Sequence, residues 1–142
     1  MSEERDLIAA VIQLANLLTK RLGPVFEKAG VTPQQWAVLT VVAANEPSIS
    51  PAAIARRMGV SKQNMTGMVD RLHQLGLVER ENDPNDLRAA RVALTRRGRS
   101  LIEKMTPAYE EWRESLRGVL PDRDLQSLER SVSRLISQLE QS

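Results

Sequence analysis

The sequence of 142 residues contains no cysteine and a single histidine, His73. The lack of cysteine excludes disulfides, thiol catalysis, thiol-based redox sensing and any cysteine-ligated zinc or iron–sulfur site. One histidine is too few for a His-rich metal centre, so we expect His73 to be exposed and not a metal ligand. A glycine-rich phosphate loop and a nucleophile with a nearby base are also missing. We therefore expect no enzyme activity, no metal and no cofactor.

Long apolar runs are missing as well. None approaches the roughly 18 residues of a membrane span, and the N-terminus lacks the basic region and apolar stretch of a secretory signal. Apolar residues still make up 42% of the sequence, a share typical of chains that build a hydrophobic core. The sequence thus predicts a soluble, cytoplasmic protein, with one domain or one domain plus an oligomerisation extension.

The net charge of +2 hides an uneven distribution. The segment from Arg56 to Arg99 carries ten basic and five acidic residues, whereas the two flanks together are mildly acidic. This asymmetry indicates that a polyanion contacts only the middle of the chain. An ordinary solvated surface could carry the same charges. The choice between a polyanion-binding surface and an ordinary one therefore depends on the helices and strands that carry the charges.

Helix-start and helix-stop signals divide the first half of the chain into four helices. Thr32, Ser50 and Ser61 fit N-caps, and Gly76 fits a C-terminal glycine. Apolar residues recur at helical spacing between these signals. The helices are expected at residues 7–26, with an interruption at 23–24, and at residues 33–44, 52–58 and 62–75.

A β-hairpin and two further helices are expected in the second half. Strands at 77–81 and 90–94 flank a turn cluster at 82–86. A long helix follows Thr95 and should kink or break near Pro107, and the final helix carries an apolar stripe at heptad-like steps. The fold class is therefore mainly α with a small β wing, a winged helix-turn-helix core flanked by terminal helices.

The helices at 52–58 and 62–75, joined by a tight turn at Gly59, match a helix-turn-helix. Its first helix crosses the phosphate backbone, where Arg56 and Arg57 fit. Its second helix points its N-terminal end into the major groove, where short or forked hydrogen-bonding side chains reach base edges. Arg88, near the tip of the hairpin, is placed to reach the minor groove. The residues expected on the second helix are Ser61, Lys62, Gln63, Asn64, Thr66 and Arg71.

The same elements would also suit an architectural or protein-interaction module without sequence specificity. In that alternative, the polar start of the second helix is only a solvated cap. The two kinds of protein differ in DNA specificity. A regulator should bind one operator at least about 10³-fold more tightly than random DNA, whereas an architectural protein should not.

The hairpin carries the most specific motif. Asp86-Leu87-Arg88, Leu94-Thr95 and Gly98 fit the pattern D-x-R-x5-L-T-x-x-G, and Met68-Val69-Asp70-Arg71-Leu72 followed by Gly76-Leu77-Val78 fits the end of a recognition helix. In these motifs, and in the order of elements over nearly the whole chain, the sequence resembles the MarR (multiple antibiotic resistance) family. The resemblance implies a homodimer on a pseudo-palindromic operator, with Arg88 in the minor groove and Asp86 as its ion-pair partner. Oxidant sensing through an N-terminal cysteine, known in some members, is excluded here.

The resemblance also implies a division into dimerisation helices at 1–31 and 99–142 around a DNA-binding domain at 32–98. The apolar stripe of the final helix supports this division, because a large exposed apolar patch is rare in a monomer. The residues expected at the interface are Leu7, Val11, Leu14, Leu125, Leu128, Val132, Leu135 and Leu139.

A small phenolic or anionic aromatic ligand that relieves repression is implied as well. In the family, such ligands bind in a crevice between the dimerisation and DNA-binding parts. Arg21 or Arg113 would pair with an anionic group there. The rings expected to border the crevice are Phe26, Trp36, Tyr109 and Trp112.

Overall fold

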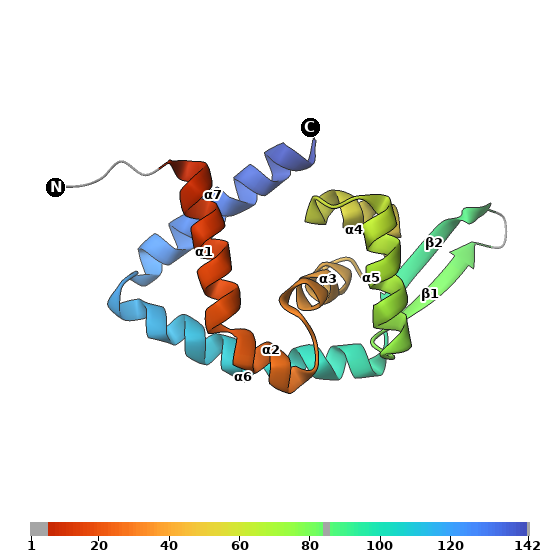
Figure 1. The fold of residues 1–142 in the computed structure, drawn as a ribbon, viewed down its shortest axis with the longest axis horizontal. Helices are drawn as coiled ribbons and strands as arrows, with labels where there is room; N and C mark the ends of the chain where they lie inside the picture. Colours follow the sequence, from red (N-terminus) through yellow and green to blue (C-terminus); the bar gives the residue numbers. More distant parts are fainter. Residues whose placement is uncertain (1–5, 84–85, 142) are drawn as a thin grey trace.

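The computed structural model describes residues 6–83 and 86–141. Figure 1 shows the helix-turn-helix and the hairpin on one side of the molecule, with α1 and α7 on the other and α6 running beneath both. In chain order the elements are α1 (Leu7–Arg21), α2 (Gly23–Ala29), α3 (Pro33–Ala43), α4 (Pro51–Met58), α5 (Lys62–Gln74), β1 (Val78–Asp83), β2 (Asp86–Leu94), α6 (Arg96–Ser115), the 3-10 turn η1 (Leu116–Gly118) and α7 (Asp122–Glu140).

The helix starts expected from the sequence are confirmed by side-chain caps. Thr32 accepts a hydrogen bond from the backbone N–H of Gln35, whose side chain accepts from Thr32 in return. Ser50 caps α4 by accepting from the backbone N–H of Ala53, and Ser61 caps α5 by accepting from the backbone N–H of Asn64. Because these bonds satisfy N–H groups that the helix itself leaves free, they fix where each helix begins.

Helix α1 ends where the chain reaches Gly23-Pro24, as expected. Pro24 lies in the first turn of α2, where its missing N–H does not disturb the helix. Gly30 then ends α2 in the left-handed conformation, with φ of 79°. The two helices together lead the chain from the exposed N-terminal arm to the winged-helix core.

The core of the winged helix is formed by side chains from α3, α4, α5 and both strands. Backbone hydrogen bonds between Ile49 and Val92, at 2.8 and 3.0 Å, join the segment before α4 to the hairpin. Burying a large aliphatic side chain contributes about 1.5–3 kcal/mol each. The most deeply buried are Val38, Leu39, Val42, Ile54, Met65, Val69, Leu72, Val78 and Val92.

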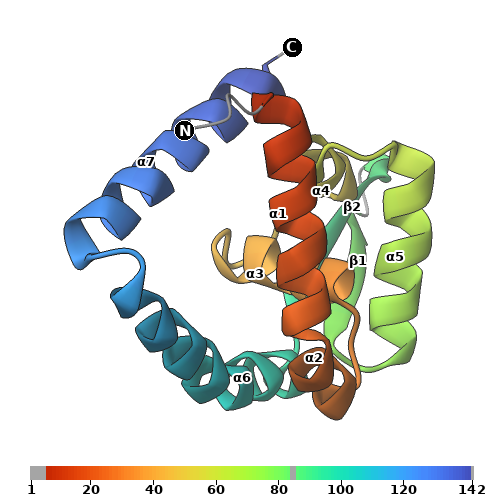
Figure 2. The same cartoon turned by 60° about the vertical axis from the view of Figure 1, so that its left-hand side comes forward.

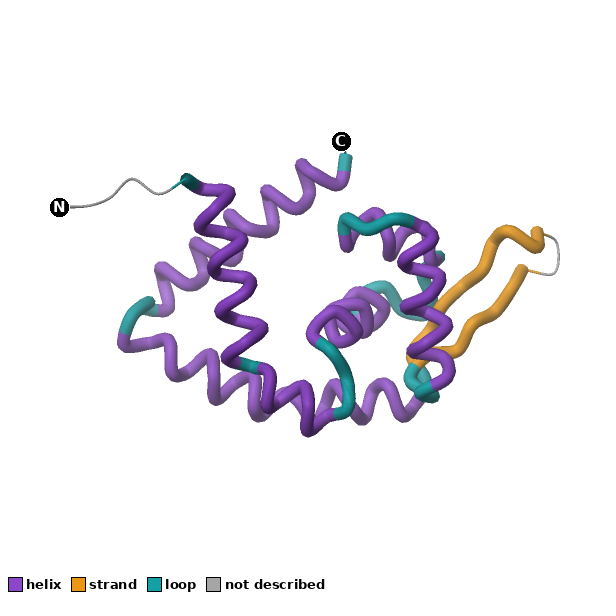
Figure 3. Tube along the Cα trace, in the orientation of Figure 1, coloured by secondary structure: helices purple, strands orange, loops and turns teal. Residues whose placement is uncertain are grey.

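The hairpin is longer than the sequence indicated. Strand β1 continues to Asp83 and β2 starts at Asp86, so that most of the expected turn cluster belongs to the strands, and Pro84 and Asn85 lie outside the described residues. The expectation of short strands was wrong because cross-strand pairing, rather than local propensity, sets strand length. Figure 3 shows the hairpin extending away from the helices.

Helix α6 runs without a break through Pro107, so the expected local break is absent. Pro107 lies on an exposed part of the helix, where water can bond the carbonyl that lacks a partner. The helix ends at Ser115, and η1 leads to α7. Figure 2 shows α7 leaving the end of α6 at an angle; α1 overlaps the winged helix in that view but lies on the opposite side from α5 in Figure 1.

Candidate nucleic-acid interface

The N-terminal half of α5 presents polar side chains to solvent on a helix whose other face is buried. The buried side chains are Met65, Val69 and Leu72. The core therefore fixes the orientation of the polar face. Exposed on that face are all five residues that the sequence analysis assigned to the major groove: Ser61, Lys62, Gln63, Asn64 and Thr66.

Two of these side chains are already bonded within the helix. The Ser61 hydroxyl accepts from the backbone N–H of Asn64 at 3.1 Å, and the Thr66 hydroxyl donates to the carbonyl of Lys62 at 3.0 Å. Ser61 thus serves first as the helix cap, and Thr66 turns its methyl group and oxygen lone pairs outward. Lys62, Gln63 and Asn64 have no such internal bond among the described contacts and are the best equipped to bond base edges.

Basic side chains flank the polar face. Arg56 and Arg57 are exposed in the last turn of α4, while Ile54 and Ala55 of the same helix are buried. Arg71 is exposed on α5, with its Nη1 3.5 Å from Gln74 Oε1. Arg56 and Arg57 precede the N-terminal end of α5, which carries the positive pole of the helix dipole, whereas Arg71 lies in the last turn of α5.

The two residues expected in the wing, Asp86 and Arg88, belong to the hairpin. The backbone of Asp86 and Arg88 belongs to β2, and Asp86 pairs with Asp83 at the far end of the hairpin. Their side chains lie outside what the structure describes, so the expected Asp86–Arg88 ion pair stays a prediction.

An ion pair that the sequence analysis missed connects the wing to α5. Arg80 Nη1 on β1 bonds Asp70 Oδ1 on α5, and both side chains are partly exposed. On the other strand, Arg91 donates to the hydroxyl and the carbonyl of Ser48, at 3.0 and 2.9 Å. The first contact joins the hairpin to α5, and the second joins it to the segment before α4. For the Asp70–Arg80 pair, the only signal in the sequence was the opposite charge of the two residues. Charge alone does not reveal a partner ten positions away.

The end of the D-x-R-x5-L-T-x-x-G motif has a structural role. The Thr95 hydroxyl donates to the carbonyl of Gly76 at 2.6 Å and accepts from the N–H of Gly98 at 3.0 Å. A Cβ at Gly98 would lie 2.2 Å from the carbonyl oxygen of Leu77, so only glycine fits there. Leu94 completes the motif with a buried side chain.

His73 is exposed, as expected, and its Nδ1–H donates to the carbonyl of Val78 at 3.2 Å. Within residues 6–83 and 86–141, no group of acidic and histidine side chains could hold a metal ion. No helix in that part of the chain is long and apolar enough to cross a membrane.

Known proteins share this fold. The model of the MarR family matches residues 29–89. The sequence is 35% identical, over 107 residues, to an HTH-type transcriptional regulator of Mycobacterium leprae, and the match covers 75% of this chain and 71% of that protein. The chain belongs to the MarR family.

Other MarR-type proteins extend the likeness over more of the chain. FarR of Neisseria gonorrhoeae, an HTH-type transcriptional regulator, is 27% identical over 119 residues, which cover 84% of this chain and 81% of FarR. The crystal structure of NadR in complex with 4-hydroxyphenylacetate matches with a TM-score of 0.82 and 25% identity, over 96% of both chains. The protein is a transcriptional regulator of winged-helix fold, and MarR-family proteins are not enzymes.

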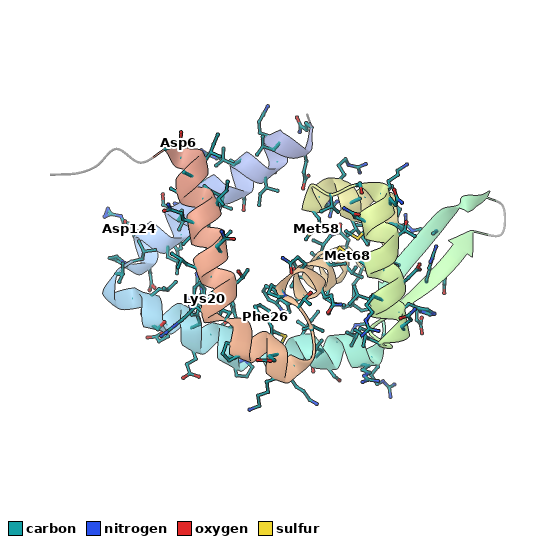
Figure 4. All side chains as sticks on the ribbon, in the orientation of Figure 1. Asp6, Lys20, Phe26, Met58, Met68 and Asp124 are labelled. Carbon is teal, nitrogen blue, oxygen red and sulfur yellow. The ribbon has the colours of Figure 1, made fainter. Side chains whose placement is uncertain are left out.

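An aromatic pocket of about 290 Å³ lies between α1, α2, α3 and α6 of this MarR-family chain. It gathers all four aromatic residues of the sequence, with centroid distances of 5.6 Å from Phe26 to Trp36, 6.5 Å from Trp36 to Tyr109 and 6.2 Å from Tyr109 to Trp112. Figure 4 labels Phe26 next to α3. The full lining is Leu18, Thr19, Leu22, Val25, Phe26, Pro33, Trp36, Ala37, Met105, Tyr109 and Trp112.

The two arginines expected at this pocket do not line it. Arg21 is exposed at the end of α1. Arg113 bonds Glu129 of α7 through Nη2 at 2.6 Å, and this hydrogen bond and the charge of Glu129 raise the pKa of Arg113 above its ordinary value. The sequence therefore predicted which rings come together, but not that both arginines would lie outside the pocket lining.

The terminal helices leave a large apolar surface uncovered. Helix α1 has no buried residue, and α7 buries only Leu125 among the described residues. The exposed fraction reaches 67% at Leu7 and 68% at Leu139. Seven of the eight residues expected at the dimer interface are therefore exposed in the single chain: Leu7, Val11, Leu14, Leu128, Val132, Leu135 and Leu139.

Proposed function

We propose that the protein is a homodimeric transcriptional repressor that binds a pseudo-palindromic operator. The observation that carries this proposal is the exposed polar N-terminal half of α5, fixed in orientation by its buried Met65, Val69 and Leu72. A recognition helix held in this manner can present Lys62, Gln63 and Asn64 to base edges in a set register.

The remaining basic residues position the protein on the duplex. Arg56 and Arg57 at the end of α4 suit phosphate contacts beside the major groove. Arg71 on α5 adds a further phosphate contact, and Arg88 of β2 reaches the minor groove with Asp86 as its ion-pair partner. These contacts supply the salt-dependent part of the affinity.

Dimerisation uses the exposed apolar surface of α1 and α7. A surface of this extent, on two helices that bury almost nothing within the chain, matches the pattern of an interface with a second copy. A two-fold dimer presents two copies of α5, so the half-sites should lie about one helical turn, ~10 bp, apart. Occupying promoter DNA in this way excludes polymerase, which favours repression.

The aromatic pocket is the proposed ligand site. It joins α1 and α2 of the N-terminal arm to α3 of the DNA-binding core and to α6. A small aromatic ligand that favours one arrangement of these helices would change the separation of the two α5 helices and release the operator. The complex of the similar protein NadR with 4-hydroxyphenylacetate supports a ligand of this size.

The test is fluorescence anisotropy with DNA from immediately upstream of the gene and with random duplex, over a series of salt concentrations. We expect binding at least about 10³-fold tighter to one upstream site than to random DNA. The affinity should also fall steeply as salt rises. Equal affinity for every duplex, in this region and in a genomic library, would favour the architectural alternative.

A further inference from the structure

The indole nitrogen of Trp36 is buried and has no hydrogen-bond partner. It is the one side-chain nitrogen or oxygen in this condition among the described residues. The great majority of buried donors in proteins have a hydrogen-bond partner, because losing water without gaining a partner is unfavourable. An exception in the wall of a pocket calls for a physical explanation.

The pocket around Trp36 has no charged side chain in its lining. The hydroxyl of Thr19, one of the few polar groups there, already donates to the carbonyl of Asn16 at 3.0 Å. Arg113, which could approach from α6, is held by Glu129. A buried carboxylate would therefore lose its hydration without meeting a cation.

We propose that the pocket selects an uncharged aromatic ligand with one hydrogen-bond acceptor, and that Trp36 Nε1–H is the donor to that acceptor. This inference rests on the proposed ligand site and names its ligand class and its specificity-determining residue. The four rings supply the apolar contact with a planar molecule. The unsatisfied donor supplies discrimination between ligands of the same shape.

The burial of Nε1 also links ligand binding to a movement of the Trp36 ring or its neighbours. Water does not reach this nitrogen in the ligand-free chain, so an acceptor reaches it only when the ring turns or its neighbours shift. Phe26 of α2 and Tyr109 of α6 contact the Trp36 ring, and Trp36 itself belongs to α3 of the DNA-binding core. Satisfying the donor therefore moves elements that connect the N-terminal arm to the core.

Three probes of nearly equal shape separate charge from hydrogen bonding: acetophenone, ethylbenzene and benzoate. They are titrated into the full-length protein labelled with ¹⁵N, and the two indole N–H signals are followed by NMR, with a Trp112→Phe variant assigning them. We expect acetophenone to bind about tenfold more tightly than ethylbenzene, as one net hydrogen bond allows. Benzoate should bind most weakly, and only acetophenone should shift the Trp36 signal downfield.

The matched variants are Trp36→Phe and Trp112→Phe, each of which removes one indole N–H from the lining. Trp36→Phe should abolish the preference for acetophenone over ethylbenzene, whereas Trp112→Phe should leave it unchanged. The inference is overturned if benzoate binds most tightly, if Trp36→Phe keeps the preference, or if no probe binds. Operator binding of each variant is measured in parallel, so that loss of the proposed regulatory function is seen separately.

Discussion

Gly98 and Thr95 hold the base of the wing in place. The Thr95 hydroxyl connects the end of β2 to the carbonyl of Gly76, and Gly98 packs directly on the backbone of Leu77. Both residues belong to the motif that resembles the MarR family. Their packing roles at the base of the wing do not depend on contact with DNA. The motif therefore reports the geometry of the wing as well as its chemistry.

Gly98→Ala should destabilise the protein by roughly 3 kcal/mol, the upper end of overpacking losses. The added Cβ would lie 2.2 Å from the Leu77 oxygen, and backbone atoms cannot yield as a flexible side chain can. Gly67→Ala is the matched control, because a Cβ there meets nothing and the helix gains about 1 kcal/mol. Urea unfolding of both variants measures the difference, and an unchanged midpoint for Gly98→Ala would contradict the packing argument.

Gln63 is a side chain that should read sequence and not merely bind DNA. Gln63→Ala should relax the preference at one base pair of the operator by about 1–3 kcal/mol. Affinity for random DNA should change little, since Gln63 carries no charge. Gln34→Ala, an exposed glutamine of α3, serves as the control. Equal losses on operator and random DNA would show that Gln63 does not contact a base.

The ion pair between Asp70 and Arg80 acts at the scale of elements, because it connects α5 to β1. Both side chains are partly exposed, so the pair should contribute less than about 1 kcal/mol to folding stability. Under the proposed function, we infer that the pair holds the wing at the angle at which β2 meets the minor groove while α5 lies in the major groove. Stability and DNA affinity should therefore respond differently to its loss.

Asp70→Asn tests this role, because the substitution should change operator affinity in opposite directions depending on whether the pair positions the wing. Removing a negative charge from a DNA-facing helix should by itself tighten binding. If the pair positions the wing, affinity for the operator instead falls severalfold, while the thermal midpoint stays nearly constant. Glu79→Gln removes a charge from an exposed site on the same hairpin and should only tighten binding. Tighter operator binding by Asp70→Asn would show that the pair does not position the wing.

The starts of α3, α4 and α5 and the exposure of the polar face of α5 were predictable, and local bonds determine the starts. Thr32, Ser50 and Ser61 each bond an N–H three residues ahead, and this signal is present in the sequence itself. The length of the hairpin and the Asp70–Arg80 pair were not predictable, because they depend on which strand or helix lies opposite. The gathering of the aromatic rings followed from the family resemblance, whereas the unsatisfied Trp36 nitrogen required the packing of three helices.

At the scale of the whole molecule, α1 and α7 are the helices that the proposed dimer would cover. Figure 2 shows α7 leaving the end of α6 and running along the edge of the molecule, and α7 contacts the winged helix at α4. Its apolar stripe is exposed in the single chain except at Leu125, which is 8% exposed. In the proposed dimer, these terminal helices join two copies, so that two α5 helices can reach successive major grooves.

Val132→Glu places a charge in the middle of the exposed stripe of α7. Burying an unpaired carboxylate at an interface is strongly unfavourable, so we expect a monomer by light scattering where the unsubstituted protein is a dimer. Operator affinity should fall by about 10²-fold or more, toward that for random DNA. Ser137→Glu adds the same charge on the opposite face of α7 and should leave both properties unchanged. A Val132→Glu monomer with full operator affinity would show that each chain recognises DNA alone, and a dimeric Val132→Glu would show that the interface does not include this stripe.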